Sequence, residues 1–169
     1  MYKVGKFEKV SFEQFYASMK DEFNMSEEDA RRAYDGLLMP SRATVGSAGY
    51  DFKSPISFAL EPSQTIKIPT GIRVHIEGGW WLGCLPRSGL GFKYQVRLAN
   101  TVGVIDSDYY FSENEGHIFA KITNGNNEGK TLMVNEGEGF MQAIFIPFGI
   151  TYDDQADGVR NGGFGSTGR

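Results

Sequence analysis

The chain has 169 residues, a length that fits one domain of ordinary size. Hydrophobic residues make up 40% and charged residues 22% of the chain, so disorder is excluded for most of its length. The formal net charge of −4 argues against a general nucleic-acid binder. This charge leaves room for an anionic small ligand, because a few arginines and backbone N–H groups suffice to hold one.

The sequence shows no sign of a membrane or export segment. No stretch approaches the roughly 18 consecutive apolar residues that would span a bilayer. Residues 1–10 lack the apolar core of a signal peptide. The only cysteine, Cys84, cannot form an internal disulfide. We therefore expect a cytoplasmic protein that does not associate with membranes.

The first elements along the chain are a short strand and then two amphipathic helices. A capping box that starts at Ser11 begins the first helix, and a second helix start lies at Ser26. Gly36 and then Pro40 end this region. We expect two short helices over about residues 11–37 that pack against the body of the protein, with a partner-binding face as the alternative.

From residue 43 onward, short β-type runs alternate with clusters of Pro, Gly, Asn and Asp. Many short strands without a helical pattern between them predict an all-β antiparallel sandwich, jelly roll or barrel. The expected strands cover residues 6–10, 49–52, 65–68, 71–76, 80–85, 96–98, 116–123, 131–134 and 142–148. Residues 151–169 have no apolar periodicity and are expected to form a flexible arm of a single domain, residues 1–169.

Four segments combine residue types that can carry chemistry. Residues 86–91 (PRSGLG) join a cation, a hydroxyl and two glycines, which suits either a phosphate site or an ordinary hairpin turn. Residues 103–109 (GVIDSDY) place two acids after a β run, as a general base, a metal ligand or turn caps. Residues 162–168 (GGFGSTG) lack the lysine of a P-loop, which leaves another phosphate-cradling loop or a linker. Residues 47–52 (SAGYDF) put an acid into an apolar strand, where its charge needs a partner.

Three other reactive side chains favour packing over chemistry. His75 lies in a strand-like run and is expected at the surface or in packing. His117 has no second histidine or cysteine at metal-ligand spacing, so we expect no zinc site. Cys84 has no evident base partner and is expected to be a small buried hydrophobic residue.

Together with residues 137–148, these four segments resemble, in chain order, the five ordered motifs of the homotrimeric deoxyuridine triphosphatase (dUTPase) family. The matching segments are SAGYDF (47–52), PRSGLGFK (86–93), GVIDSDYY (103–110), GEGFMQAIFIPF (137–148) and RNGGFGSTG (160–168). The resemblance implies a distorted jelly-roll subunit of the β-clip type, in which residues 11–37 are a helical insertion and residues from about 151 a C-terminal arm. It further implies a homotrimer with shared active sites and Mg²⁺-dependent hydrolysis of dUTP to dUMP and pyrophosphate. In this family, that reaction limits the incorporation of uracil into DNA and supplies dUMP for thymidylate synthesis.

The resemblance also implies roles for single residues. Asp106 matches the family's catalytic acid, which orients and deprotonates the attacking water. Tyr109 matches the ring that packs on deoxyribose, and Asn100 matches the position that reads uracil. Asp51 matches the first-motif acid, which lies near Mg²⁺ through water. Further substrate-binding positions are Arg87, Ser88, Gly89, Gly103, Ile105, Phe119 and Gln142, with Arg160, Phe164, Gly165, Ser166 and Thr167 in the arm that closes over the nucleotide.

The chain departs from the family pattern in several places. Gly139 stands where the fourth motif usually has an arginine, so a structural salt bridge is either missing or replaced. Met141 stands where the family usually has an alanine, and the fifth motif is one residue shorter than usual. About five extra residues within 110–115 are expected to lengthen the tip of the uracil hairpin.

Two other functions compete with dUTP hydrolysis. A deoxycytidine triphosphate deaminase shares the fold but needs a glutamate base on the strand after the third motif, and residues 117–122 contain none. A non-catalytic protein that binds a protein partner through the trimer surface or the helical insertion is the other alternative. The presence of Asp106, Arg87, Gln142 and Phe164 favours a catalytic protein, in which such a binding role can coexist.

Overall fold

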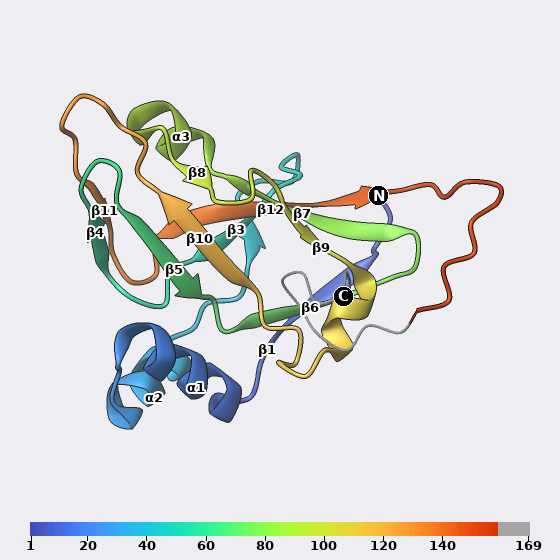
Figure 1. Cartoon of the computed structure of the whole chain (residues 1–169), viewed down its shortest axis with the longest axis horizontal. Helices are drawn as coiled ribbons and strands as arrows, with labels where there is room; N and C mark the ends of the chain where they lie inside the picture. The colour runs from blue at the N-terminus through green and yellow to red at the C-terminus, as the bar shows by residue number, and fades with distance from the viewer. Residues whose placement is uncertain (159–169) are drawn as a thin grey trace.

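The computed structural model describes residues 1–158 and places two N-terminal helices beneath a body of antiparallel sheets (Figure 1). The elements before the first site segment are β1 (Gly5–Lys9), α1 (Phe12–Phe23), α2 (Glu27–Asp35), β2 (Ser41–Arg42), β3 (Tyr50–Lys53), β4 (Phe58–Leu60), β5 (Thr65–Pro69), β6 (Ile72–Ile76) and β7 (Trp80–Pro86). They are followed by α3 (Ser88–Tyr94), β8 (Arg97–Leu98), β9 (Gly103–Ile105), a 3₁₀ helix η1 (Ser107–Phe111), β10 (Phe119–Thr123), β11 (Leu132–Val134) and β12 (Gly139–Pro147). Within the described residues, no helix is both long and apolar enough to cross a membrane.

Antiparallel pairs build all the sheets. The largest has the order β2-β3-β12-β7-β9, and a second has the order β5-β10-β8. Strands β1 and β6 form one further pair, and β4 and β11 form another. Sequential neighbours often lie in different sheets, as in a jelly roll. The expected all-β fold with a helical insertion near the N-terminus is therefore confirmed.

The core between the sheets fixes the strands that carry the predicted site. Phe52, Leu82, Ile118, Ile122 and Phe140 are almost completely buried in one cluster. Burial of one such side chain contributes roughly 1.5–3 kcal/mol relative to exposure. Because these residues come from β3, β7, β10 and β12, or directly precede β10, the strands around the site are held rigidly relative to one another.

The two predicted N-terminal helices are confirmed. The Ser11 hydroxyl accepts a hydrogen bond from the Gln14 backbone N–H, and the Ser26 hydroxyl caps α2 in the same way. Their apolar faces form a second buried cluster that includes Phe15 and Met19. The helices pack against the β5 side of the body, in agreement with the expectation (Figure 1).

Residues 110–115 do not lengthen a hairpin tip, so that expectation is wrong. Strand β9 pairs with β7, whereas β10 pairs with β5 and β8, so β9 and β10 form no hairpin with each other. The extra residues fold back on the N-terminal segment instead. The Tyr110 hydroxyl donates to the Glu8 carboxylate at 2.5 Å, and both the hydroxyl and the backbone N–H of Ser11 donate to Glu115.

Several elements were not anticipated from the sequence. The segment after Pro86 forms helix α3 and not a hairpin turn, and Gln95 ends it in the left-handed conformation at φ 52°. Two of the seven residues of α3 are glycine, which has a low helix propensity. The local sequence therefore did not indicate a helix here. The short strands β2 and β4 were also missed.

Candidate active site

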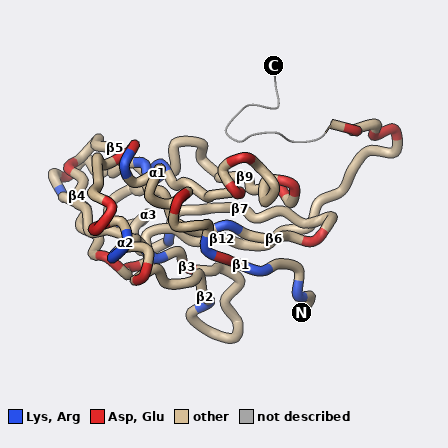
Figure 2. Tube along the Cα trace, turned by 90° about the horizontal axis from the view of Figure 1, so that it is seen from below, with Lys and Arg blue, Asp and Glu red and all other residues tan. Residues whose placement is uncertain are grey.

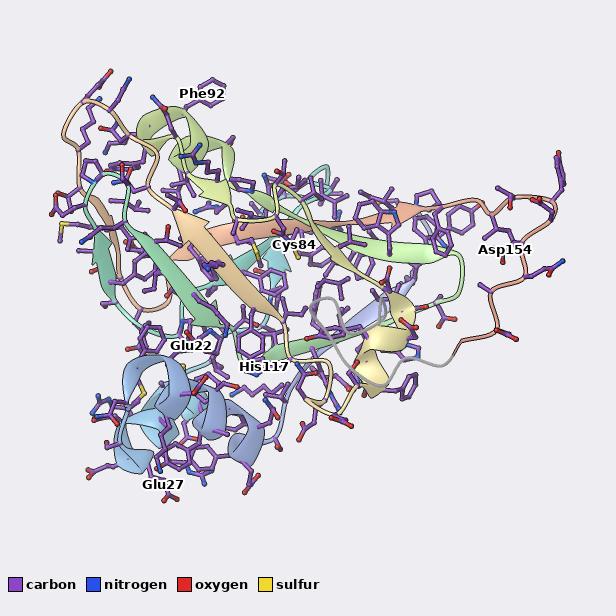
Figure 3. All side chains as sticks on the ribbon, viewed as in Figure 1. Glu22, Glu27, Cys84, Phe92, His117 and Asp154 are labelled. Atoms are coloured by element: carbon purple, nitrogen blue, oxygen red, sulfur yellow. The ribbon has the colours of Figure 1, made fainter. Side chains whose placement is uncertain are left out.

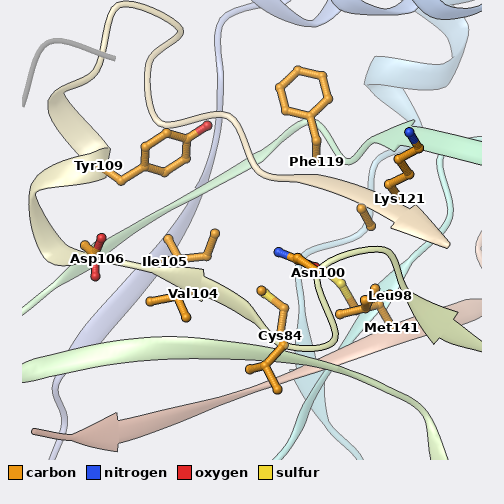
Figure 4. A pocket seen from close by; sticks show the side chains of 13 residues that line it. Cys84, Leu98, Asn100, Val104, Ile105, Asp106, Tyr109, Phe119, Lys121 and Met141 are labelled. Atoms are coloured by element: carbon orange, nitrogen blue, oxygen red, sulfur yellow. The ribbon is translucent and has the colours of Figure 1, made fainter. Parts of the chain in front are cut away.

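The first site feature is a cavity of about 290 Å³, here named the ring cavity, between β9, η1 and β10 (Figure 4). Its lining residues come from β7, β8, β9, η1, β10 and β12 and from the loop between β8 and β9 (Figure 4). Six of the sequence-predicted site residues line it: Asn100, Gly103, Ile105, Asp106, Tyr109 and Phe119. The structure therefore brings together six of the eleven predicted site residues that lie within residues 1–158.

Close contact between β7 and β9 forms the floor of the ring cavity. Gly103 lies opposite Cys84 in the register, and a Cβ at Gly103 would lie 3.0 Å from the Cys84 Cβ. A larger residue at position 103 would push the two strands apart. Burial raises the pKa of the Cys84 thiol to about 12, which keeps it protonated. The expectation of a small buried hydrophobic residue is confirmed for Cys84.

Tyr109 is held from both sides of its hydroxyl group. It is only 5% exposed, and its hydroxyl donates to the His117 carbonyl oxygen at 2.8 Å. The Asn114 side-chain amide donates to the same hydroxyl at 2.8 Å. These bonds fix the ring against the cavity, so Tyr109 presents a rigid wall.

Asp106 stands where β9 ends and η1 begins. Its backbone is extended, and its carbonyl accepts a hydrogen bond from the Tyr109 N–H at 3.2 Å. The strand and the 3₁₀ helix thus fix the Asp106 backbone from both sides. Among the described residues that line the ring cavity, Asp106 is the only carboxylate.

The second feature, here named the arginine cavity, has a volume of about 400 Å³ and lies at β3, β12 and the start of α3. Five further sequence-predicted residues line it: Asp51, Arg87, Ser88, Gly89 and Gln142. The Gln142 side-chain amide donates to the Pro86 carbonyl at 2.9 Å, and its oxygen lies where a Cβ on Gly49 would clash. The lining includes one cation, one carboxylate, one side-chain amide and the hydroxyls of Ser47 and Ser88.

Arg87 supplies the partner that the Asp51 charge needs. The Arg87 Nε lies 3.0 Å from one Asp51 oxygen, and Nη2 donates to the other at 3.3 Å. Nη1 donates to the Gly139 carbonyl at 2.8 Å. A Cβ at Gly139 would lie 2.7 Å from Nη1, so the missing side chain makes space for the guanidinium. The Arg87 guanidinium thus lies where a side chain at position 139 would be, and it carries the salt bridge to Asp51.

The two cavities lie on opposite faces of the largest sheet. Met141 lines the ring cavity and Gln142 lines the arginine cavity, and successive side chains of a strand point to opposite faces. The two sets of lining residues have no member in common. Within one chain, the structure does not bring the two halves of the predicted site together.

Two aspects of the site differ from the sequence-based description. Lys121 and Met141 line the ring cavity, although neither was predicted there. Strand alternation from Phe119 could have indicated Lys121, which is two residues further along.

Acidic and basic residues are interspersed over the described trace in the view of Figure 2. The predicted arm residues Arg160, Phe164, Gly165, Ser166 and Thr167 lie outside the described residues.

No resident metal site appears in residues 1–158, because no three His, Cys, Asp or Glu side chains there lie close enough to hold an ion. Asp51 is a single carboxylate that is already paired with Arg87. A donor set of this kind suits contact with a hydrated ion through water, and it does not suit a protein cage around the ion.

The fold and the two cavities define a class of protein. It is an all-β jelly-roll protein in which one cavity is lined by aromatic side chains and an aspartate, and a second, separate cavity contains an arginine. A family model described as dUTPase matches residues 36–168. The chain is 38% identical to the deoxyuridine 5'-triphosphate nucleotidohydrolase of Lactococcus lactis over 136 residues, which are 79% of this chain and 89% of that protein. The chain therefore belongs to the dUTPase family.

Solved structures agree with this assignment. The dUTPase from Streptococcus mutans matches with a TM-score of 0.62 and 31% identity, over 86% of this chain and 97% of that one. A mutant dUTPase from phage phi11 of S. aureus, described as coordinating a structural Mg(II) ion, matches with a TM-score of 0.62 over 92% and 98% of the two chains. At 19% identity, the phage protein supports the fold alone.

Proposed function

We propose that this protein hydrolyses dUTP to dUMP and pyrophosphate, with Mg²⁺, by attack of water on the α-phosphate. The observation that carries the proposal is the convergence of Asn100, Asp106 and Tyr109 on one cavity in a chain of the dUTPase family. This reaction limits uracil incorporation into DNA and supplies dUMP for thymidylate synthesis. The protein is proposed to act in the cytoplasm as a single domain, residues 1–169.

The ring cavity is the proposed nucleoside site. Tyr109 is buried and fixed through its hydroxyl group, so its ring cannot move away from a sugar that is placed against it. A ribose 2'-hydroxyl pressed against that ring would lose its hydrogen bonds, which selects for deoxyribose. The Asn100 amide can donate to and accept from a base edge. Ile105, Phe119 and Gly103 complete the walls.

Asp106 is the proposed general base. The acid stands at a backbone position that β9 and η1 fix, which is the rigidity that a positioned base needs. It would orient water and take up its proton as the oxygen attacks the α-phosphate. The rival deaminase needs a glutamate from β10, and that strand, with the sequence FAKIT, carries none.

The arginine cavity is the proposed triphosphate site. Arg87 can form charge-assisted hydrogen bonds with phosphate oxygens, while Ser88, Gly89 and Gln142 add neutral contacts. We propose that Asp51 would hold Mg²⁺ through water beside the triphosphate. Bound there, the ion would supply positive charge that offsets the charge of the phosphates. Arg160 and the hydroxyls of Ser166 and Thr167 are proposed to close over the phosphates, and Phe164 over the base, with Gly165 allowing the approach.

One nucleotide cannot occupy both faces of a sheet, so we propose that the complete site forms between subunits of a homotrimer. A contact between different faces of the same chain closes into a ring of three when the rotation is three-fold. The ring cavity of one subunit would then meet the arginine cavity of another. The opposite placement of Met141 and Gln142 on β12 supports this arrangement.

The test is the release of pyrophosphate from dUTP and from dCTP, measured side by side with Mg²⁺. We expect release from dUTP alone. Ammonia from dCTP without pyrophosphate would instead support a deaminase, and no reaction with either nucleotide would support a binding protein. Light scattering that shows an active monomer would contradict the shared site.

A further inference from the structure

Helix α1 lies behind the wall of the ring cavity and contacts it through two separate side-chain links. We propose that α1 positions Phe119 within the nucleoside site through His117 and Lys67, so that the helical insertion determines how tightly the deoxynucleotide binds. This inference rests on the proposed function, because it assigns a role to that same site. Residues 11–37 line neither cavity, so the role is one of positioning.

The first link runs through the buried imidazole of His117. Its Nε2 accepts a hydrogen bond from the Gly71 backbone N–H at 2.8 Å, which leaves the proton on Nδ1. Nδ1 lies 3.3 Å from the Ser18 hydroxyl on α1, and that hydroxyl in turn donates to the Gln14 carbonyl. Burial lowers the pKa of His117 to about 3, so the imidazole is neutral and its tautomer is defined.

His117 also contacts both Phe119 and Tyr109. The centroid of its ring lies 4.5 Å from that of Phe119 at an interplanar angle of 43°. Its backbone carbonyl accepts the Tyr109 hydroxyl at 2.8 Å. Phe15 of α1 packs on the same imidazole, with centroids 6.4 Å apart. A shift of α1 would therefore move the residue on which Phe119 and Tyr109 both rest.

The second link runs through Lys67 on β5. Its ammonium lies 5.0 Å from the centroid of the Phe119 ring, within the range of a cation–π interaction. The same ammonium forms a salt bridge with Glu22 on α1. Glu22 and His117 both lie along the boundary between the helices and the strands (Figure 3). Phe119 is thus in contact with an imidazole and an ammonium, and α1 holds both.

The structure argues against a purely local role for these contacts. Phe15 and Met19 of α1 are completely buried, so the helix is a fixed platform and not a loose appendage. The half-buried Phe119 ring lines the cavity, although its contacts with His117 and Lys67 lie outside it. The position of the ring then depends on α1, and the shape of the nucleoside site depends on the ring.

The experiment uses the full chain and compares Lys67→Met and Ser18→Ala with wild type. Each change removes one link while it keeps a similar side-chain volume. We expect the KM for dUTP to rise about two- to fivefold in each variant, the range of a cation–π contact or a neutral hydrogen bond, with kcat within about twofold. Lys67→Arg keeps a cation over the ring and should restore the KM. Asp29→Asn, which breaks an exposed ion pair on α2, is the matched control and should leave the KM unchanged.

A lower melting temperature with an unchanged KM would overturn the inference, because the insertion would then only stabilise the fold. A Lys67→Arg variant that behaves like Lys67→Met would also overturn the role of the cation. If the wild-type chain releases no pyrophosphate from dUTP, the proposed function fails, and the inference is tested separately in the ligand-free protein. In the ligand-free protein, the aromatic NMR signals of Phe119 are identified by their absence in Phe119→Leu. These signals should shift in Lys67→Met and Ser18→Ala and should not shift in Asp29→Asn. Signals that do not move would rule out positioning by α1.

Discussion

The two cavities are held in place by different forces. In the ring cavity, Tyr109 is fixed by neutral hydrogen bonds that lie inside the protein and need no ligand. In the arginine cavity, Arg87 is fixed by the Asp51 carboxylate, which a phosphate would have to share or replace. Because Arg87 is partly exposed, solvent weakens that ion pair, and the guanidinium can turn to a ligand at modest cost.

This difference suggests a division of work. Under the proposed function, the ring cavity is shaped before a nucleotide arrives, so it would select the nucleoside. The arginine cavity responds to charge, so it would hold the phosphates once the nucleoside is in place. Variants in the two cavities should therefore affect different halves of the ligand, and a variant that affects both would break the comparison.

The largest effect is expected for Asp106→Asn. The amide keeps the size of the side chain and loses the base, so kcat should fall by roughly 10²–10⁴ while affinity for dUTP stays within several-fold. Stopped assays of pyrophosphate release and calorimetric binding of a non-hydrolysable analogue give the two values. Turnover near the wild-type level would refute the assignment of Asp106.

Arg87→Met should follow in size. Hydrogen bonds to charged groups contribute about 1.5–3 kcal/mol, so the KM for dUTP should rise roughly ten- to 100-fold. Binding of deoxyuridine, which has no phosphate, should stay unchanged if the cavities act separately. Arg97→Met, outside both cavities, is the control. A parallel loss of deoxyuridine binding would show that the two cavities are not independent.

Acid should lower the free energy of unfolding through His117, the residue that supports the ring cavity. The pKa of His117 in the folded protein is about 3, below the ordinary value of 6.5, so only the unfolded chain takes up a proton between these values. The free energy of unfolding should therefore be undiminished above about pH 6.5 and should fall by up to about 1.4 kcal/mol per pH unit toward pH 3.

Denaturant unfolding at several pH values measures this slope, and His117→Asn should flatten it because the new side chain does not titrate. His75→Asn is the matched control, since His75 is exposed. An equal slope in wild type and His117→Asn would assign the acid sensitivity to other groups.

The smallest effect is expected for Gly139→Ala. The added Cβ would lie 2.7 Å from Arg87 Nη1 and 3.2 Å from Nε, so the guanidinium must shift. We expect it to give up the Gly139 carbonyl and to keep the stronger pairing with the Asp51 carboxylate. Loss of one partly exposed hydrogen bond should lower kcat/KM for dUTP about fivefold, with binding of deoxyuridine unchanged. Gly149→Ala, where nothing lies near the new Cβ, should behave as wild type. An unchanged kcat/KM in Gly139→Ala would show that the carbonyl contact does not position Arg87.

Local chemistry in the sequence determined the elements whose signals lie within a few residues. The caps at Ser11 and Ser26 and the apolar periodicity after them are sufficient for the two N-terminal helices, because capping and amphipathicity act within one or two turns. Most strands followed from short β runs between turn residues. The site residues of both cavities could be named because their motifs are contiguous in the chain.

Tertiary structure alone decided how those residues are distributed in space. Strand β9 pairs with β7 and not with β10, which no local signal indicates, since pairing depends on residues about 20 positions apart. In the sequence, Gly139 is notable only because the family usually has an arginine at that position. In the fold, the absence of a side chain at Gly139 leaves room for the Arg87 guanidinium. The placement of one predicted set on each face of a sheet likewise arises from packing, because strand alternation separates adjacent residues while long-range pairing unites distant ones.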